Sequence, residues 1–154
     1  MRYSKKWSSK TECTLIFPKR VMVSGYFDGI HNGHLDYLEQ SRSTNGFIIC
    51  VVASDEQLLK KKGKVFNNQK ERCHLVDVVL RGLRLPHEIY VNCSVDGTVA
   101  DVLRVFRPEI FFRGYDKTLE TMPEAERKAC EELGIKIRHA KNRIGERHSS
   151  EIFK

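Results

Sequence analysis

Short runs of hydrophobic residues alternate along this chain with stretches in which hydrophobic residues recur at helical spacing. Unbroken apolar runs of about four to eight residues are typical of strands buried on both faces of a parallel sheet. Such runs predict strands over residues 20–25, 47–53, 88–92, 109–112 and 135–138. The helical spacing predicts helices over residues 35–42, 69–81 and 99–106, a short helix after residue 54, and a last helix that opens at 121–124 and closes at 134.

Residues that commonly begin and end helices lie at several of these boundaries. Asn68 precedes the longest predicted helix and Gly82 follows it, Asp96 is placed to cap the next one, and Thr121 and Glu124 have capping-box spacing. Strands that alternate with helices of this length imply right-handed crossovers between parallel strands. We therefore expect an α/β protein with a Rossmann-like, doubly wound parallel sheet of about five strands.

The length of 154 residues fits one domain, and we divide the chain into a basic N-terminal extension, residues 1–18, and a folded domain, residues 19–154. The longest apolar run, residues 47–53, is much shorter than the roughly 20 residues needed to span a bilayer. The run at 13–17 is too short for the core of a signal peptide. We expect no membrane association and a cytoplasmic protein.

The five cysteines lie at positions 13, 50, 73, 93 and 130 and show no C-x-x-C spacing. An odd number without paired spacing fits reduced thiols better than a disulfide framework or a zinc site. The formal charge of +7 and the pI near 9.2 indicate an anionic partner, which can be a nucleic acid or a small phosphorylated ligand. Charge alone leaves both open.

The first predicted strand of the domain runs directly into the segment from Gly25 to His34, and a helix follows. A helix N-terminus presents free backbone N–H groups and a partial positive charge, so a strand-to-helix junction of this kind binds phosphate. His31 and His34 flank Gly33, which lets a ligand approach the backbone closely.

This segment resembles the G-x-F-D-x-x-H-x-G-H signature of the cytidylyltransferase-like nucleotidyltransferases. The resemblance implies that His31 and His34 contact a triphosphate and stabilise the α-phosphate during the reaction. It also identifies residues 19–154 as a nucleotidyltransferase domain. The nucleotide-binding residues that it implies in this segment are Gly25, Tyr26, Phe27, Asp28 and Gly33.

Three further segments resemble motifs of the same family in the same order. The lysine run 60–64 implies a phosphate contact by Lys64, and the segment 69–72 makes Arg72 a candidate phosphate clamp. The segment 143–152 resembles the family's serine motif over the β- and γ-phosphates, and Gly114 with Asp116 lies in a candidate nucleotide or acceptor turn. The implied residues of the serine motif are Arg143, Arg147, Ser149 and Ser150.

The resemblance implies transfer of AMP or CMP from ATP or CTP to a phosphorylated small molecule, with release of pyrophosphate. Mg²⁺ is expected to be bound through the triphosphate, without metal ligands from the protein, and a homodimer is expected. The segment 107–135 is similar to the sugar-phosphate branch, which includes heptose 1-phosphate adenylyltransferase, and glycerol-3-phosphate cytidylyltransferase is another relative. A sugar or polyol phosphate is therefore the favoured acceptor.

Three alternatives remain. The turn at residues 114–116 resembles the archaeal-type FAD synthetases, which adenylylate FMN. A catalytically idle protein that binds nucleotides or nucleic acid is a second alternative, although the scarcity of basic residues interleaved with exposed aromatic ones makes nucleic acid the less favoured partner. A fragment related to class I aminoacyl-tRNA synthetases is the third, and the short length argues against it.

Overall fold

The computed structural model describes residues 4–7, 13–16 and 19–142 of the chain. Two short strands, β1 (Ser4–Trp7) and β2 (Cys13–Ile16), pair antiparallel in a sheet of their own. The main sheet has five strands: β3 (Lys19–Gly25), β4 (Gly46–Ala53), β5 (His87–Asn92), β6 (Ile110–Arg113) and β7 (Lys136–His139). The helices are α1 (Asn32–Gln40), the 3-10 helix η1 (Ser41–Thr44), α2 (Asp55–Lys62), α3 (Gln69–Gly82), α4 (Ala100–Phe106) and α5 (Glu124–Leu133).

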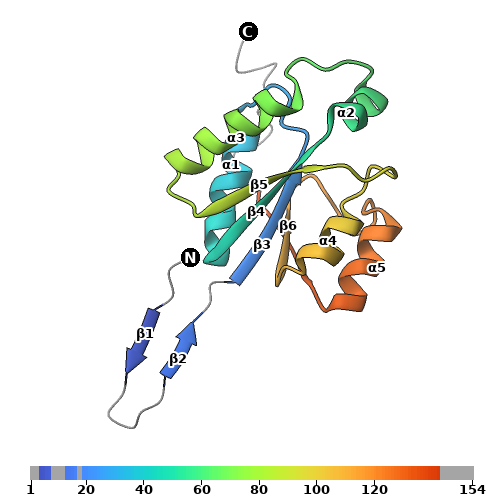
Figure 1. Ribbon diagram of the computed structural model, residues 1–154. Coiled ribbons are helices and arrows are strands. Elements are labelled where there is room, and N and C mark those ends of the chain that lie inside the picture. Colours follow the sequence, from blue (N-terminus) through green and yellow to red (C-terminus); the bar gives the residue numbers. More distant parts are fainter. Residues whose placement is uncertain (1–3, 8–12, 17–18, 143–154) are drawn as a thin grey trace.

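The main sheet is parallel throughout, with the strand order β5-β4-β3-β6-β7. Helices α1 and α3 cover one face and α4 and α5 cover the other (Figure 1). The chain extends the sheet from β3 in one direction through β4 and β5, and in the other through β6 and β7. The strand order therefore reverses between β3 and β6, and the prediction of a Rossmann-like, doubly wound α/β fold of five strands is confirmed.

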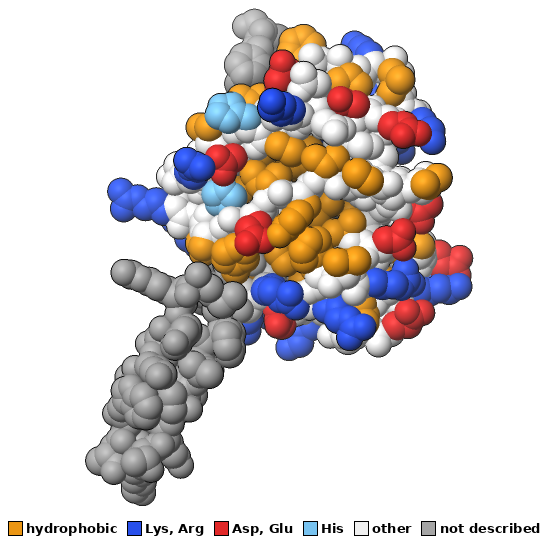
Figure 2. All heavy atoms as spheres, viewed as in Figure 1, with side chains coloured by type: hydrophobic (Ala, Val, Ile, Leu, Met, Phe, Trp, Pro, Cys, Tyr) orange, Lys and Arg blue, Asp and Glu red, His pale blue; other side chains and the backbone are white. Residues whose placement is uncertain are grey.

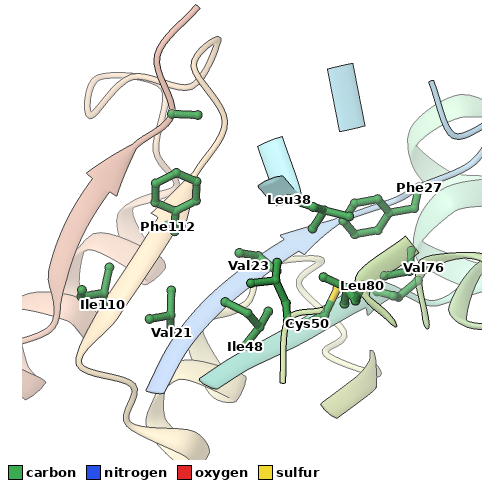
Figure 3. Close-up of a cluster of buried hydrophobic side chains, with 13 residues drawn as sticks. Val21, Val23, Phe27, Leu38, Ile48, Cys50, Val76, Leu80, Ile110 and Phe112 are labelled. Carbon is green, nitrogen blue, oxygen red and sulfur yellow. The ribbon is translucent and has the colours of Figure 1, made fainter. Parts of the chain in front are cut away.

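The core consists of two layers, one on each side of the sheet. Val23, Cys50 and Phe112 point towards α1 and α3, where they pack with Leu38 and Leu80 (Figure 3). The opposite layer joins the other faces of the same strands to α4 and α5. Because both faces are covered, the central strands are apolar at nearly every position, which is why their sequences form unbroken runs.

Helix α1 begins earlier than the hydrophobic spacing predicts, because a histidine caps it. His31 accepts a hydrogen bond from the backbone N–H of Gly33 at 3.0 Å, and His34 accepts one from the backbone N–H of His31 at 3.3 Å. This reciprocal pair takes the place of the usual serine, threonine or aspartate cap. Two residues with catalytic potential therefore also define where the helix starts.

Two predicted caps are wrong. Asp96 does not cap α4, since its carboxylate accepts hydrogen bonds from the backbone and hydroxyl of Thr98, and Val99 is the cap residue. Thr121 does not cap α5, because it pairs with Thr118 and the helix begins only after Pro123. In both cases a nearer hydroxyl or backbone group competes for the same side chain. The predicted cap Asn68 is confirmed, and it bonds Glu71 N at 2.9 Å.

The cysteines of the described domain are free thiols at positions 50, 73, 93 and 130. Of the helices formed by the described residues, none has the length and apolar character of a membrane span.

Candidate active site

A cavity of about 810 Å³ opens at the carboxyl ends of the strands, where the strand order reverses between β3 and β6. Ligands of doubly wound sheets bind at this position. Tyr37 of α1 joins the two strands below the cavity, since its hydroxyl donates to Phe112 O at 2.6 Å and accepts from Ser24 N at 3.2 Å. The lining includes most of the residues named from the sequence, namely Gly25, Tyr26, Phe27, Asp28, His31, Gly33, His34, Gly114 and Asp116.

The turn after β3 brings the backbone close to the floor of the cavity. Phe27 is buried in a left-handed conformation, with φ of +54°, and its ring lies against Gly25 and His34. A Cβ atom at Gly25 would come within 3.0 Å of that ring, and one at Gly33 would come within 2.7 Å of the His31 ring. Glycine at both positions thus allows the two aromatic systems to fill the turn.

His31 and His34 lie side by side, with ring centroids 4.0 Å apart. Both Nδ1 atoms accept backbone N–H groups, so the neutral rings carry their protons on Nε2. Backbone hydrogen bonds therefore hold both imidazole donors in place. A phosphate oxygen at the N-terminus of α1 would receive these donors together with the helix dipole.

Both imidazoles remain neutral at physiological pH. Desolvation, followed by the charges of His31 and Lys62, lowers the pKa of His34 to about 4, against the opposing effect of Asp116. The pKa of His31 is lowered too, by desolvation and by Lys62. The pair thus offers two neutral N–H donors to an anion, at a site already polarised by a nearby lysine.

Lys62, not Lys64, is the lysine at the site. Lys61 and Lys62 line the cavity, and the ammonium of Lys62 lies 5.5 Å from the centre of the Tyr26 ring. Helix α2 ends at Gly63, whose φ of +75° reverses the chain, and Lys64 is exposed and does not contribute to the lining. The turn at Gly63 separates Lys64 from the helix that faces the cavity, and its contact with a phosphate remains a prediction.

Arg72 does not act as a phosphate clamp in this structure. Its side chain is fully buried, and its guanidinium donates to the carbonyls of Asn67, Tyr26 and Ala53 at 2.7–2.9 Å. It also forms an ion pair with Asp55 at 2.9 Å. A guanidinium with these four partners positions the loops around the cavity instead of contacting a ligand.

Asp28 lines the cavity, but its carboxylate is engaged by the chain that leads into α3. Its two oxygens accept the backbone N–H groups of Phe66 and Asn67 at 2.9 and 2.7 Å. Desolvation is the largest single influence and raises the pKa of Asp28, yet these bonds and the charges of Arg72 and Lys62 outweigh it and lower the pKa. Asp28 and Arg72 together fix the turn after β3 to the start of α3.

We call the part of the lining formed by His31, His34, Lys61 and Lys62 the cationic side. Across the cavity lies a second part, the carboxylate side, formed by Glu126 of α5 with Asn92 of β5 and Val99, the cap residue of α4. Glu126 is only 8% exposed, and its Oε1 accepts from Val99 N at 3.1 Å. Desolvation raises the pKa of Glu126 despite the Val99 bond and the charge of Arg113. Sequence reasoning missed this residue because its position in α5 resembles that of an exposed helical glutamate.

The turn after β6 forms the end of the cavity between the two sides. Arg113 is buried and donates to Thr118 O at 2.8 Å, while Tyr115 and Asp116 are exposed at the rim. A Cβ atom at Gly114 would come within 2.9 Å of a carboxylate oxygen of Asp116, so the turn depends on this glycine. The serine motif with Arg143, Arg147, Ser149 and Ser150 lies outside the described residues.

A doubly wound parallel sheet with paired histidines at a helix N-terminus on its carboxyl edge is the arrangement expected of a nucleotide-binding transferase. Residues 22–154 match the model of the family described as cytidylyltransferase-like. The chain belongs to this cytidylyltransferase-like family and is a nucleotidyltransferase.

Individual relatives agree with this assignment. The chain is 31% identical over 121 residues to the FAD synthase of Picrophilus torridus, and the matched segment covers 77% of this chain and 80% of that protein. It is 29% identical over 100 residues to the bifunctional protein HldE of Aliarcobacter butzleri, covering 64% of this chain and 20% of that protein. Among solved structures, the lipopolysaccharide core biosynthesis protein of Thermoplasma volcanium has a TM-score of 0.61 and 28% identity, covering 80% of this chain and 97% of that one.

Proposed function

We propose that this chain transfers a nucleotidyl group, AMP in the first instance, from a nucleoside triphosphate to a phosphorylated small molecule and releases pyrophosphate. The observation that carries the proposal is the pair of neutral imidazoles, 4.0 Å apart, at the N-terminus of α1. Both have their Nδ1 atoms occupied by the backbone, so both Nε2–H groups are available to phosphate oxygens.

The reaction requires charge stabilisation more than covalent catalysis. An oxygen of the acceptor phosphate forms a bond to the α-phosphorus while the bond from that phosphorus to the bridging oxygen of the β-phosphate breaks, and pyrophosphate leaves. Negative charge on the phosphoryl oxygens would be met by His31, His34 and the N-terminus of α1, with Lys62 beside them. Donors fixed in advance at the place where charge develops are the main source of rate in such reactions.

We propose that Mg²⁺ binds through the triphosphate. Within residues 19–142, His, Cys, Asp and Glu side chains form no group of three or more that could hold a metal ion. Mg²⁺ is commonly held by substrate phosphates with one or two carboxylates, and Asp116 at the rim fits that smaller role. When bound, the ion would neutralise charge on the triphosphate.

FMN is the acceptor that we place first, with ATP as the donor. Tyr115 in the turn after β6 is 41% exposed and lines the cavity, where its ring could contact a flat aromatic acceptor. The FAD synthases among the relatives support the same choice, since the chain spans 80% of the Picrophilus protein. The resemblance of residues 114–116 to the FAD synthetases is a third line of support.

A sugar or polyol phosphate is the second candidate acceptor. It is supported by the resemblance of residues 107–135 to the sugar-phosphate branch and by the match to the bifunctional protein HldE. The carboxylate side also suits a hydroxylated acceptor, because carboxylate oxygens accept hydrogen bonds from hydroxyl groups. CTP as the donor, a homodimer and the division at residue 18 remain predictions.

The experiment is a pyrophosphate-release assay with Mg²⁺, in which ATP or CTP is combined with FMN, glycerol 3-phosphate and heptose 1-phosphate. Turnover of ATP with FMN is the expected result, and turnover only with a sugar or polyol phosphate would replace FMN by the second candidate. His34→Ala should lower kcat about 10²-fold, the usual effect of removing one donor to the reacting phosphate or oxyanion.

The matched control is His74→Ala, which removes an exposed histidine of α3. It should leave kcat unchanged. A folded His34→Ala protein with the wild-type rate would refute the role of the histidine pair. Absence of turnover in the whole panel, from protein that binds ATP, would favour the idle nucleotide-binding alternative.

A further inference from the structure

The edge of the sheet opposite the cavity has an uneven charge distribution. We define the amino-end row as the exposed basic residues at the amino ends of the strands and in the segments that lead into them. Its members are Lys19, Arg20, Arg42, Arg84, Arg107 and Lys136. Basic side chains gather along the lower margin of the molecule in Figure 2, the end at which β3 begins in Figure 1.

Hydrogen bonds and strand pairing make these residues neighbours. The guanidinium of Arg20 donates to Arg107 O at 2.9 Å. The backbone N–H of Glu109 donates to Arg20 O, and the backbone N–H of Lys136 donates to Glu109 O. On the other side Lys19 pairs with Gly46, and the guanidinium of Arg42 donates to Leu83 O. Arg42 and Arg84 both line a hollow of about 540 Å³ that includes Gly46 and Leu83. The row therefore follows the amino ends of all five strands, a distance of about 20 Å at the usual strand spacing.

Among the residues that the structure describes, the cations of the row have no ion-pair partner, whereas some cations elsewhere do. Arg72, Arg81 and Arg104 each form an ion pair with a carboxylate. Within residues 19–142, no carboxylate forms an ion pair with a member of the row. Glu109 is one of the acids beside the row, and its carboxylate accepts the backbone N–H of Arg20. The row is thus an exposed concentration of positive charge.

Two members of the row occupy a backbone conformation that disfavours arginine. Arg84 has φ of +56° and Arg107 has φ of +46°, at the ends of α3 and α4. Glycine is the usual residue at such positions because it adopts positive φ without strain. Helix C-termini also favour cations, but this accounts neither for Lys19 nor for Lys136, which begin strands. Glycine is therefore the matched substitution at both positions, since it removes the charge without adding strain.

We propose that the amino-end row is a binding surface for the phosphate backbone of double-stranded nucleic acid, separate from the catalytic cavity. One strand of a duplex presents a phosphate about every 3.4 Å along the axis, so a row of about 20 Å faces roughly six phosphates. The exposed aromatic side chains of residues 19–142, Phe66 and Tyr115, lie at the opposite edge of the sheet. The row thus binds backbone charge without stacking on bases, and it does not select sequence.

The test uses the full chain and fluorescence anisotropy with a 20-base-pair DNA duplex and the corresponding RNA duplex, at several salt concentrations. The key variant is Arg84→Gly with Arg107→Gly, which removes two charges and relieves two strained conformations. It should bind at least 10-fold more weakly, and the slope of log K against log salt should fall by about 2. Its melting temperature should be unchanged or higher, which excludes unfolding as the cause. The two duplexes distinguish DNA from RNA as the source of the backbone.

Two controls make the comparison strict. Asn45→Gly relieves a similar positive φ, +53°, in the same region without removing charge, and it should bind as the wild type does. Lys70→Ala with Arg127→Ala removes two exposed charges elsewhere and should alter binding much less. ATP at saturating concentration should not compete with the duplex.

Several outcomes would overturn the proposal. The first is that the wild type does not bind either duplex, and the second is that the Arg84→Gly, Arg107→Gly protein binds as tightly as the wild type. The third is that the Lys70→Ala, Arg127→Ala control loses as much affinity as that double variant. The fourth is that ATP displaces the duplex. Binding to vesicles of anionic lipid without binding to either duplex would assign the row to a membrane surface instead. Since none of these measurements depends on turnover, they are independent of the acceptor assignment.

Discussion

The two sides of the catalytic cavity differ in charge and in how their charged groups are held. On the cationic side, two imidazoles are held by the backbone of one turn, and Lys62 is carried by α2 with its ammonium over the Tyr26 ring. On the carboxylate side, Glu126 is buried and bonded to a neighbouring helix through Val99. Because cations attract phosphate, we expect the nucleotide phosphates to lie on the cationic side of the cavity.

The largest expected effect is on the free energy of unfolding, when Arg72 beneath the cationic side is removed. Arg72→Ala should lower the free energy of unfolding by about 3–5 kcal/mol, because three carbonyls and Asp55 lose a buried partner. Urea unfolding without nucleotide measures this. Arg81→Ala, on the exposed face of the same helix, is the control and should change stability by at most about 0.5 kcal/mol. Unchanged stability with lost ATP binding would restore Arg72 as a phosphate ligand.

A pH titration of stability is expected to show the burial of His34. Its pKa is about 4 in the folded chain and near 6.5 when unfolded, so below pH 6.5 the unfolded state binds the additional proton. Stability should therefore be complete above pH 6.5, fall as the pH decreases towards 4, and lose about 3 kcal/mol from this group. Comparing the wild type with His34→Gln by urea unfolding at each pH isolates the effect. Parallel curves for the two proteins would show that His34 does not contribute.

A comparison of two lysines tests how far the cationic side extends along the chain. Lys62→Ala should raise the KM for ATP about 10-fold, because it removes a charge next to the histidine pair, corresponding to about 1.4 kcal/mol. Lys64→Ala removes the same charge two positions further on and should leave KM within about twofold. Steady-state kinetics at fixed acceptor concentration measures both. The opposite ranking would move the phosphate site to the far side of Gly63.

The smallest effect is expected on the carboxylate side. Glu126→Gln keeps an oxygen that can accept from Val99 N but removes the negative charge, so the fold should be retained. The KM for the acceptor should rise about fivefold while the KM for ATP stays constant. Glu124→Gln, an exposed position of the same helix, is the control. A change in the KM for ATP alone would place the nucleotide, and not the acceptor, against Glu126.

The parts of the fold that follow from local pattern could be predicted from sequence. Buried strands are apolar at nearly every position, and the turn from Gly25 to His34 holds its histidines through bonds within four residues. Side chains that are placed by long-range contacts have no corresponding pattern in the sequence. Arg72 is buried because Tyr26 and Ala53, which are 46 and 19 positions away, bring their carbonyls to it. A basic residue near the start of a helix looks the same in sequence whether it is buried or exposed.

Glu126 illustrates the same limit on the opposite side of the cavity. Its burial depends on the packing of α5 against α4, which the sequence of α5 alone does not specify. Lys62 and Lys64 differ only in which side of Gly63 they occupy, and a run of lysines hides this difference. The order of the motifs was readable, whereas the side chains that reach the cavity depend on how the elements meet in space.

The guanidinium of Arg72 also has a consequence for the order in which the protein can acquire its site during synthesis. The histidine turn leaves the ribosome before the residues that fix it to its surroundings, which are residues 66, 67 and 72. Strand β6, which pairs with β3 at the cavity, follows only at residue 110. Until residues 66, 67 and 72 have been made, the nascent chain carries the histidine turn without the contacts that fix it. The cavity of the folded protein can form only after β6 has been made as well.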